Sequence, residues 1–244
     1  MEAVEEHIAD GAVLRLIESF LKQGVMESGR EWQPTETGTP QGAVISPLLA
    51  NLYLDPLDHL MVRRGREMVR YADDFVILCQ TKEEAQETLA QLKEWVAGAG
   101  LALHPVKTRI VEANAPGGFD FLGYHFERGH HWLREKSLQK FRDAIRQKTP
   151  RMRPGPMSQI AGEVNRTVRG WFEYFKHSLA NVMEREDKWI RHRLRAILRK
   201  RHKRRQRDKR SRNHRWPNAY FAELGLFSLA IAQAQASQLR KRNH

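Results

Sequence analysis

The chain has 244 residues and a formal net charge of +13 at pH 7, so it is strongly basic and long enough for one large or two small cores. Residues 185–215 contain 16 Lys or Arg and 3 Asp or Glu, which accounts for the whole excess and predicts a polyanionic partner, with nucleic acid the first candidate and an anionic membrane surface the second. The single cysteine excludes an internal disulfide framework, no apolar run approaches the ~20 residues of a membrane span, and the acidic first residues do not resemble a signal peptide. We therefore expect a cytoplasmic protein with no membrane partner.

The first part of the chain predicts helices and a loop. Apolar residues recur at helical spacing over residues 3–24, with Asp10 at a break that would divide the stretch into two helices. Residues 25–37 predict a short strand pair. A loop rich in Gly and Pro then leads to Ser46, an N-cap candidate followed by a proline at the first helical position. The helix predicted over residues 48–61 has an apolar face that should pack against a sheet.

Two adjacent acids, Asp73 and Asp74, lie between short apolar runs that favour strands. This pattern predicts a β-hairpin with Ala72, Asp73 and Asp74 at its tight turn. Such a turn holds both carboxylates at the tip of a rigid scaffold, where a hard divalent cation can reach their oxygens. From the pair alone, ordinary turn chemistry is the favoured interpretation, because Asp side chains hydrogen-bond their own backbone.

A helix and further strands are predicted after the hairpin. Residues 82–97 have an amphipathic pattern, with Thr81 as N-cap and glycines at the end. A turn then precedes a strand predicted over residues 107–111. The aromatic-rich residues 119–126 predict another strand, with residues 131–133 as its hairpin partner. This order of elements favours an α+β domain with helices on one face of an antiparallel sheet.

From residue 137 onward, the pattern predicts helices only. The expected helices cover residues 137–148, 157–175 and 179–203, with a proline-rich loop between the first two. Composition therefore places a domain boundary near residue 135. After the basic block, residues 216–221 predict an aromatic-rich turn, which is followed by a short apolar-to-polar tail.

Several short motifs follow one another along the chain. They are Thr39-Pro40-Gln41-Gly42, Ser46-Pro47-Leu48-Leu49-Ala50-Asn51, Tyr71-Ala72-Asp73-Asp74, Leu103-His104-Pro105-Val106-Lys107-Thr108 and Phe121-Leu122-Gly123-Tyr124. As a set, they resemble the reverse transcriptase of group II intron-encoded proteins across residues 1–126. The motif Gly170-Trp171-Phe172-Glu173-Tyr174-Phe175 is similar to the thumb, or maturase, region of the same family. Trp216-Pro217-Asn218-Ala219-Tyr220-Phe221 either resembles the C-terminal region of such proteins or is a simple aromatic turn that packs the tail.

The resemblance implies a fold and an activity. The implied fold class is α+β, with a partial polymerase palm (an antiparallel sheet with helices on one face), an all-helical thumb and a basic C-terminal extension. The implied domains are the palm over residues 1–135, the thumb or maturase domain over residues 136–184, and the basic nucleic-acid-binding extension over residues 185–244. The implied function is that of an RNA-directed DNA polymerase and intron maturase, which performs two-metal nucleotidyl transfer with RNA and a DNA primer as partners.

The resemblance also assigns roles to single residues. Asp73 and Asp74 are the implied Mg²⁺ ligands, with Asp73 the stronger candidate, and Mg²⁺ favours carboxylate and phosphate oxygens. Lys107 would face the triphosphate, with a solvated surface lysine as the alternative. The implied nucleotide- and template-binding residues are Thr39, Pro40, Gln41, Gly42 and Tyr71, with a plain turn glycine the alternative for Gly42 and simple packing the alternative for Tyr71. The implied primer-supporting residues are Phe121, Leu122, Gly123 and Tyr124, for which a place in the core is the alternative.

The basic block would follow nucleic-acid phosphates. Its candidate residues are Arg199, Lys200, Arg201, Lys203, Arg204 and Arg205. Contacts of this kind give an affinity that falls steeply with salt concentration, and they carry little sequence information.

One expected catalytic residue is missing from the pattern. Members of the family have a further aspartate on an earlier strand, and Asp10, which lies beside Gly11 between helical segments, does not match it. We therefore expect an N-terminally truncated polymerase that extends primers poorly or not at all alone, because positional errors of about 1 Å can cost on the order of 100-fold in rate. The alternatives are a non-catalytic RNA-binding splicing factor, a non-functional remnant, or one half of a split enzyme completed by a separate N-terminal fragment.

Overall fold

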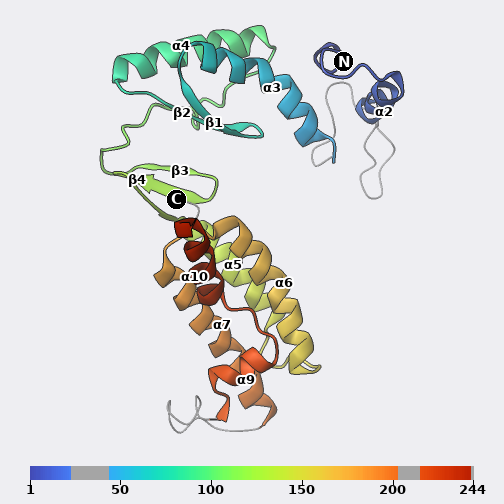
Figure 1. Cartoon of the computed structure of the whole chain (residues 1–244), viewed down its shortest axis with the longest axis vertical. Coiled ribbons are helices and arrows are strands. Elements are labelled where there is room, and N and C mark those ends of the chain that lie inside the picture. Colours follow the sequence, from blue (N-terminus) through green and yellow to red (C-terminus); the bar gives the residue numbers. More distant parts are fainter. Residues whose placement is uncertain (23–43, 203–214, 243–244) are drawn as a thin grey trace. The chain divides into compact units, whose positions relative to one another are not determined.

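The computed structural model describes residues 1–22, 44–202 and 215–242 (Figure 1). Within those ranges, the chain forms two compact units that divide between Glu112 and Ala113. Each unit contains its own cluster of buried apolar side chains. The sequence predicts a boundary near residue 135, where the composition changes, whereas the structure groups the three strands before that position with the helices after it.

Two helices open the first unit: α1 is Glu2–Glu5 and α2 is Gly11–Leu21. The predicted break between them is confirmed. The Asp10 carboxylate caps α2 by accepting hydrogen bonds from the N–H of Ala12 at 2.7 Å and of Val13 at 3.2 Å. Residues 25–37, for which the sequence predicts a strand pair, lie outside the described residues.

A hairpin and two helices share the core of the first unit. The elements are α3 (Ser46–Arg63), β1 (Glu67–Tyr71), β2 (Asp74–Leu78) and α4 (Lys82–Gly98). Figure 1 shows both helices on the same side of the hairpin. The buried cluster contains Leu57, Met61, Leu92 and Val96 from the helices, with Met68, Phe75 and Ile77 of the hairpin packed against it. The prediction that the apolar face of the helix over residues 48–61, which is α3, packs against a sheet is confirmed.

Two details of the first unit differ from the predictions. Because α3 begins at Ser46, Ile45 and not Ser46 is the N-cap, and no side chain caps this end. The following proline fits the first turn, where its missing N–H would have no helical partner. The strand predicted over residues 107–111 does not form. A strand needs a neighbour for its N–H and C=O groups, and β1 and β2 pair only with each other in the described part of this unit.

A three-stranded antiparallel sheet opens the second unit. Its strands are β3 (Phe119–Phe121), β4 (Tyr124–Glu127) and β5 (His130–Leu133), paired in chain order. The single strand predicted over residues 119–126 is therefore wrong. Leu122 and Gly123 form a two-residue turn with φ of +47° and +82°, which folds the stretch into a hairpin.

Helices form most of the remaining second unit that the structure describes. They are α5 (Glu135–Lys148), α6 (Met157–Phe175), α7 (Ala180–Arg201), α9 (Asn218–Glu223) and α10 (Leu229–Arg242). The three helices predicted after residue 137 are confirmed, with small shifts at their ends. Figure 1 shows α5, α6 and α7 side by side around a core that includes Ile145, Val164, Met183, Ile190, Leu194 and Phe221. None of the helices in the described ranges combines the length and apolarity needed to cross a bilayer.

The C-terminal part of the chain is more helical than the sequence predicts. The predicted aromatic turn over residues 216–221 leads into α9, and the tail after it forms α10. The predicted domain boundary between residues 184 and 185 lies inside α7. Although the composition changes along it, α7 is one continuous helix, because its basic half still buries an apolar stripe.

Candidate active site

The carboxylates of Asp73 and Asp74 lie at the tip of the β1–β2 hairpin. Tyr71 pairs with Asp74 across the strands, so Ala72 and Asp73 form the tight turn, which confirms the predicted hairpin. Both aspartates are exposed, and among the described residues none forms a hydrogen bond or ion pair with either carboxylate. Ala72 has a φ of +53°, which is uncommon outside glycine, so the turn that carries the acids is strained.

An arginine behind the turn contacts its backbone. Nη1 of Arg70 donates to the C=O of Ala72 and to Oδ1 of Asn51, both at 3.0 Å. The same guanidinium makes a bidentate pair with Asp58 of α3, in which Nε lies 2.8 Å from Oδ1 and Nη2 contacts Oδ2. The hydrogen bond to Asp58 is the main reason that the pKa of Arg70 is raised above its ordinary value. These contacts were not predicted from the sequence, although Asn51 and Asp58, seven residues apart, share one face of α3.

A second arginine connects the base of the hairpin to α4. Nε of Arg66 donates to Oγ1 of Thr88 at 3.0 Å, and Nη1 contacts Glu84. Glu84 also accepts the N–H of Gln80 at 2.6 Å and forms a capping box with Thr81, which is the predicted N-cap. The backbone hydrogen bond from Gln80 is the largest effect that lowers the pKa of Glu84. The hairpin is thus bonded to both helices, which gives the two carboxylates a rigid support.

Two other predicted site residues of the first unit are exposed. The Tyr71 side chain is 62% exposed and lies on the face of the hairpin opposite Arg70. Lys107 lies in a turn, where its backbone N–H donates to Nδ1 of His104 at 3.4 Å. No hydrogen bond or ion pair joins Lys107 to Asp73 or Asp74, three residues that the structure describes. The structure therefore does not bring Lys107 into contact with the carboxylates.

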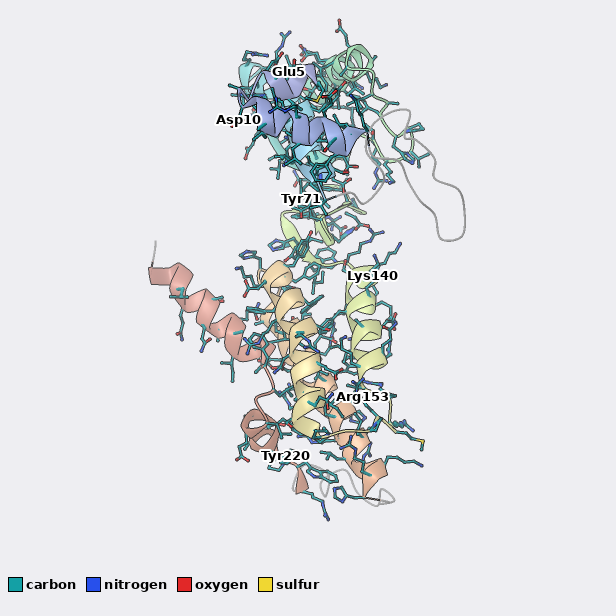
Figure 2. All side chains as sticks on the ribbon, turned by 90° about the vertical axis from the view of Figure 1, so that its right-hand side faces the viewer. Glu5, Asp10, Tyr71, Lys140, Arg153 and Tyr220 are labelled. Carbon is teal, nitrogen blue, oxygen red and sulfur yellow. The ribbon has the colours of Figure 1, made fainter. Side chains whose placement is uncertain are left out.

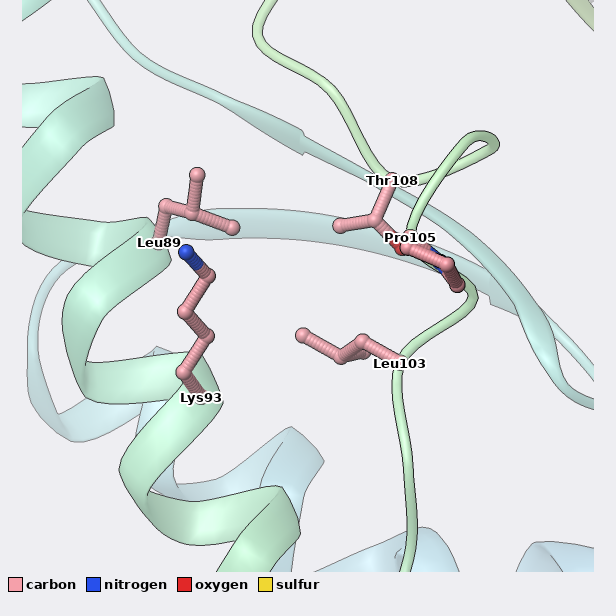
Figure 3. Close-up of a pocket in the computed structure, with 5 residues that line it drawn as sticks. All are labelled: Leu89, Lys93, Leu103, Pro105 and Thr108. Atoms are coloured by element: carbon pink, nitrogen blue, oxygen red, sulfur yellow. The ribbon is translucent and has the colours of Figure 1, made fainter.

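A cavity of about 350 Å³ opens beside this turn (Figure 3). It is lined by Leu89 and Lys93 of α4 and by Leu103, Pro105 and Thr108 of the segment that follows. Figure 3 shows the amine of Lys93 next to Leu89, with Leu103 and Pro105 across the gap. The lining includes neither aspartate of the hairpin, so this cavity is separate from the candidate active site.

The predicted primer-supporting residues form the β3–β4 hairpin of the second unit. They are Phe121, Leu122, Gly123 and Tyr124, all half-buried. A Cβ atom on Gly123 would come within 3.0 Å of Cζ of Phe175 and 3.1 Å of Oγ of Ser137, which donates to the Gly123 C=O at 3.1 Å. The Tyr124 ring packs on Phe175 with centroids 5.3 Å apart, and burial raises the pKa of Tyr124 to about 12. This hairpin is therefore packed firmly against α5 and α6.

The predicted phosphate-binding block begins in the last turn of α7. Arg199 is half-buried, whereas Lys200 and Arg201 are exposed. Nη2 of Arg201 donates to the C=O of Arg153 at 2.7 Å, and Figure 2 shows Arg153 toward the same end of the helical bundle as Tyr220. The predicted residues Thr39, Pro40, Gln41, Gly42, Lys203, Arg204 and Arg205 lie outside the described residues.

Arginines also gather around the loop that follows α5. Arg193 of α7 donates to Oγ1 and to the C=O of Thr149, both at 2.7 Å. Burial, and then the positive charges of Arg146 and Arg151, lower the pKa of Arg193. The guanidinium groups of Arg146 and Arg193 lie 5.6 and 5.7 Å from the ring centroid of Trp189. Arg193 lies within the basic block predicted from the sequence, before the candidate residues named there, whereas Arg146 and Arg151 precede the block. This concentration of like charge and aromatic surface favours an anionic, nucleic-acid partner.

The aromatic motif after the basic block belongs to the helical core. Nε of Arg195 donates to the C=O of Trp216 at 2.9 Å, and Nη2 donates to Oδ1 of Asn218 at 2.8 Å. The Trp216 and Phe221 side chains are both buried. For these aromatic residues the structure favours the packing interpretation.

The acids of the hairpin fit a magnesium ion in number and type. Among the described residues, no group of three or more His, Cys, Asp or Glu side chains gathers at one point. In this part of the chain, Asp73 and Asp74 thus offer two carboxylates and no third ligand of these types gathers with them. Mg²⁺ is commonly bound by one or two carboxylates together with substrate phosphates and water, so a pair of free carboxylates is a suitable donor set.

Comparison with known families agrees with the motifs. The family model described as reverse transcriptase (RNA-dependent DNA polymerase) matches residues 2–126, which is more than half of the chain. The chain therefore belongs to the reverse transcriptase family. A second family model, described as the group II intron maturase-specific domain, matches residues 138–216. Together with the intron-encoded relatives below, these matches define a group II intron reverse transcriptase/maturase and confirm the resemblance of the motifs.

Three relatives illustrate the similarity. Protein YkfC of Escherichia coli (strain K12) is 29% identical over 163 residues, which are 52% of this chain and 42% of that protein. Group II intron-encoded protein LtrA of Lactococcus lactis subsp. cremoris is 45% identical over 56 residues, which are 23% of this chain and 9% of that protein. The uncharacterized 91 kDa protein in cob intron of Schizosaccharomyces pombe is 23% identical over 257 aligned residues, covering 69% of this chain and 31% of that protein. The matched region spans less than half of each relative.

Proposed function

We propose that this chain performs RNA-directed DNA synthesis of the group II intron type, with Asp73 and Asp74 as ligands of catalytic Mg²⁺. The observation that carries the proposal is the pair of exposed carboxylates, which have no partner among the described residues and lie at the tip of a hairpin bonded to two helices. It occurs in a chain of the reverse transcriptase family. Divalent metal bound at such a pair stabilises negative charge on the reacting oxygens of nucleotidyl transfer.

The other residues of the chain bind and orient the substrates in this proposal. Tyr71 exposes its ring next to the two acids, where it can contact the nucleotide or the primer end. Lys107 provides a mobile positive charge for the triphosphate. The segment Thr39-Pro40-Gln41-Gly42 contacts the nucleotide and template, and the hairpin of Phe121-Leu122-Gly123-Tyr124 supports the DNA primer. The arginines of the helical unit bind RNA phosphates.

Primer extension on an RNA template with Mg²⁺ tests this function. The purified chain should extend a DNA primer only slowly, because the further aspartate of the family has no match in the sequence, and Asp73→Asn with Asp74→Asn should abolish the remaining extension, since both metal ligands are lost. Glu67→Gln is the matched control, because Glu67 is an exposed acid at the open end of the same hairpin and should leave the rate unchanged. Extension that survives the loss of both aspartates would overturn the proposal.

A second candidate function is RNA binding in intron splicing without polymerisation. It is favoured by the arginines around Trp189: Arg146 is paired with Asp143, but among the described residues no acid pairs with Arg193, whose pKa is lowered by burial and by the charges of Arg146 and Arg151. In this case the chain should assist splicing with Asp73→Asn and Asp74→Asn in place. Arg151→Gln should weaken RNA binding and reduce the slope of log K against log salt concentration by about 1. Splicing assistance that fails in the aspartate variants, with RNA affinity unchanged, would argue against it.

A further inference from the structure

The turn that carries Asp73 has a backbone conformation that needs support. Ala72 has a φ of +53° although it is not glycine. Such conformations persist only where the surrounding structure holds them. The C=O of Ala72 accepts a hydrogen bond from Nη1 of Arg70 at 3.0 Å, so the strained residue is held by a side chain of β1 that lies two residues earlier in the chain.

The guanidinium of Arg70 is itself fixed by α3. Nε lies 2.8 Å from Oδ1 of Asp58, Nη2 contacts Oδ2 of the same carboxylate, and Nη1 lies 3.0 Å from Oδ1 of Asn51. All three nitrogens are therefore bonded, in the planar geometry that suits a bidentate carboxylate. Because Asn51 and Asp58 lie on one face of a helix of 18 residues, their positions are set by a rigid element.

This arrangement excludes a direct role for Arg70 on substrate phosphates. The side chain is only 11% exposed, and its three nitrogens already have partners on α3 and on the turn. The positive charge is matched by Asp58 at close range. Arg70 therefore acts on the backbone of the turn.

We propose that Arg70 is a positioning residue, which joins α3 to the Ala72 carbonyl and thereby fixes the backbone that carries the Asp73 carboxylate. The consequence for metal binding rests on the proposed function, whereas the contact itself does not. A lysine cannot replace Arg70, because one ammonium cannot bond a bidentate carboxylate, an amide and a carbonyl in these directions. Arg70→Lys keeps the positive charge and loses the planar set of hydrogen bonds, so it separates the contribution of the charge from that of the hydrogen-bond geometry.

Hydrogen–deuterium exchange on the full chain tests the contact without any need for activity. In Arg70→Lys and Arg70→Gln, peptides that cover residues 67–78 should exchange faster by at least about tenfold, since a hydrogen bond from a charged group is lost. Peptides from α4 should exchange at the wild-type rate. Arg63→Gln is the matched control, because Arg63 is an exposed arginine in the last turn of α3 and should change neither region. Unchanged exchange in residues 67–78 would overturn the proposal.

Asn51→Ala provides a second variant in case an Arg70 variant does not fold. It removes one acceptor at an exposed position and leaves the pair between Arg70 and Asp58 in place. The exchange of residues 67–78 should then rise, by less than in Arg70→Lys. Exchange equal to the wild type would show that Asn51 does not help to hold the guanidinium, which contradicts the proposal.

Mn²⁺ alone, followed by electron paramagnetic resonance, tests the consequence for the metal site. Arg70→Lys should weaken Mn²⁺ binding by about tenfold while the thermal midpoint changes little, because the turn is displaced but the fold is kept. Asp73→Asn is the reference for a lost ligand. If Asp73→Asn leaves Mn²⁺ binding unchanged, the proposed function fails and the exchange data alone decide the contact. If Asp73→Asn weakens binding and Arg70→Lys does not, the positioning role is overturned.

Discussion

The replacement of Gly123 by alanine is the sharpest test of how the β3–β4 hairpin is held. Gly123 has a φ of +82°, and a Cβ atom there would lie 3.0 Å from Cζ of Phe175 and 3.1 Å from Oγ of Ser137. Gly129, in the next turn of the same sheet, has a φ of +73° and no atom within 4 Å of the added Cβ. The two glycines therefore share a backbone conformation and differ in their surroundings, so Gly129→Ala is a matched control.

The expected loss of stability follows from these two contributions. A left-handed conformation costs an L-residue about 1–2 kcal/mol, and both variants should lose this amount. Extra volume in a packed site typically costs a further 1–3 kcal/mol, and only Gly123→Ala should lose that. It also disturbs the hydrogen bond from Ser137 to the Gly123 carbonyl. We therefore expect Gly123→Ala to lower the free energy of unfolding by about 1–3 kcal/mol more than Gly129→Ala does.

Urea denaturation followed by tryptophan fluorescence measures this difference. The second unit contains four of the six tryptophans, which are Trp132, Trp171, Trp189 and Trp216. With a denaturant dependence of about 2 kcal/mol per molar urea, the midpoint of Gly123→Ala should lie on the order of 1 M below that of Gly129→Ala. Equal midpoints would refute the reasoning, because they would mean that α5 and α6 do not confine the hairpin.

Three further predictions concern a core, a buried ion pair and the effect of pH. Leu57→Ala, at a side chain with no exposed surface, should lower the free energy of unfolding of the first unit by about 2–5 kcal/mol in urea denaturation; a loss below that range would mean that the site collapses around the cavity. Arg142→Met should lower the free energy of unfolding by about 3 kcal/mol, because it leaves the fully buried Glu186 without its bidentate partner. The further change Glu186→Leu should recover most of that loss, and a double variant as unstable as Arg142→Met would contradict this expectation. The pKa of Glu84 in the folded chain is below its ordinary value of 4.5, chiefly because its carboxylate accepts the N–H of Gln80. The contribution of Glu84 to stability is therefore complete above its pKa in the unfolded chain, and it is lost as pH falls through its pKa in the folded chain. The thermal midpoint of the wild type should therefore fall more steeply from about pH 5 to about pH 3 than that of Glu84→Gln, and parallel curves would contradict this sign.

Local signals predicted the elements whose partners are near in sequence. The hairpin around Asp73 joins strands that are adjacent along the chain, so apolar runs and a turn were sufficient to predict it. The helix after Thr81 carries its own capping box. The strand predicted over residues 107–111 was wrong because strand formation depends on a neighbour, which the sequence pattern of the segment does not contain. The turn at Leu122 was missed because aromatic residues favour strands on both sides of it.

The site was predicted only in part, for a related reason. Asp73 and Asp74 are visible in the sequence because their chemistry is in their side chains. Arg70 is not, because its role depends on contacts with Asn51 and Asp58, which are 19 and 12 residues away in the chain. Two patterns in the sequence could have indicated this role. Arg70 occupies a strand position on the face that packs on the helices, and Asn51 and Asp58 lie seven residues apart on one face of the helix opposite it.

The two hairpins assigned to the reaction share one structural device. In each, a two-residue turn begins with a non-glycine residue of positive φ, Ala72 or Leu122. In each, a carbonyl of that turn accepts a hydrogen bond from a side chain: the Ala72 carbonyl from Arg70, and the Gly123 carbonyl from Ser137. The β4–β5 turn, to which no role is assigned, also begins with a non-glycine residue of positive φ, Arg128, so this conformation does not by itself mark a functional turn. It differs from the β3–β4 turn in the open space around its glycine. Because a reacting group must be held to within a fraction of an ångström, contacts that fix the backbone of a turn belong where the turn presents such a group. The feature that the β1–β2 and β3–β4 hairpins have in common is therefore the side-chain hydrogen bond to a turn carbonyl, and the variants of Arg70 and Gly123 test what each turn gains from its surroundings.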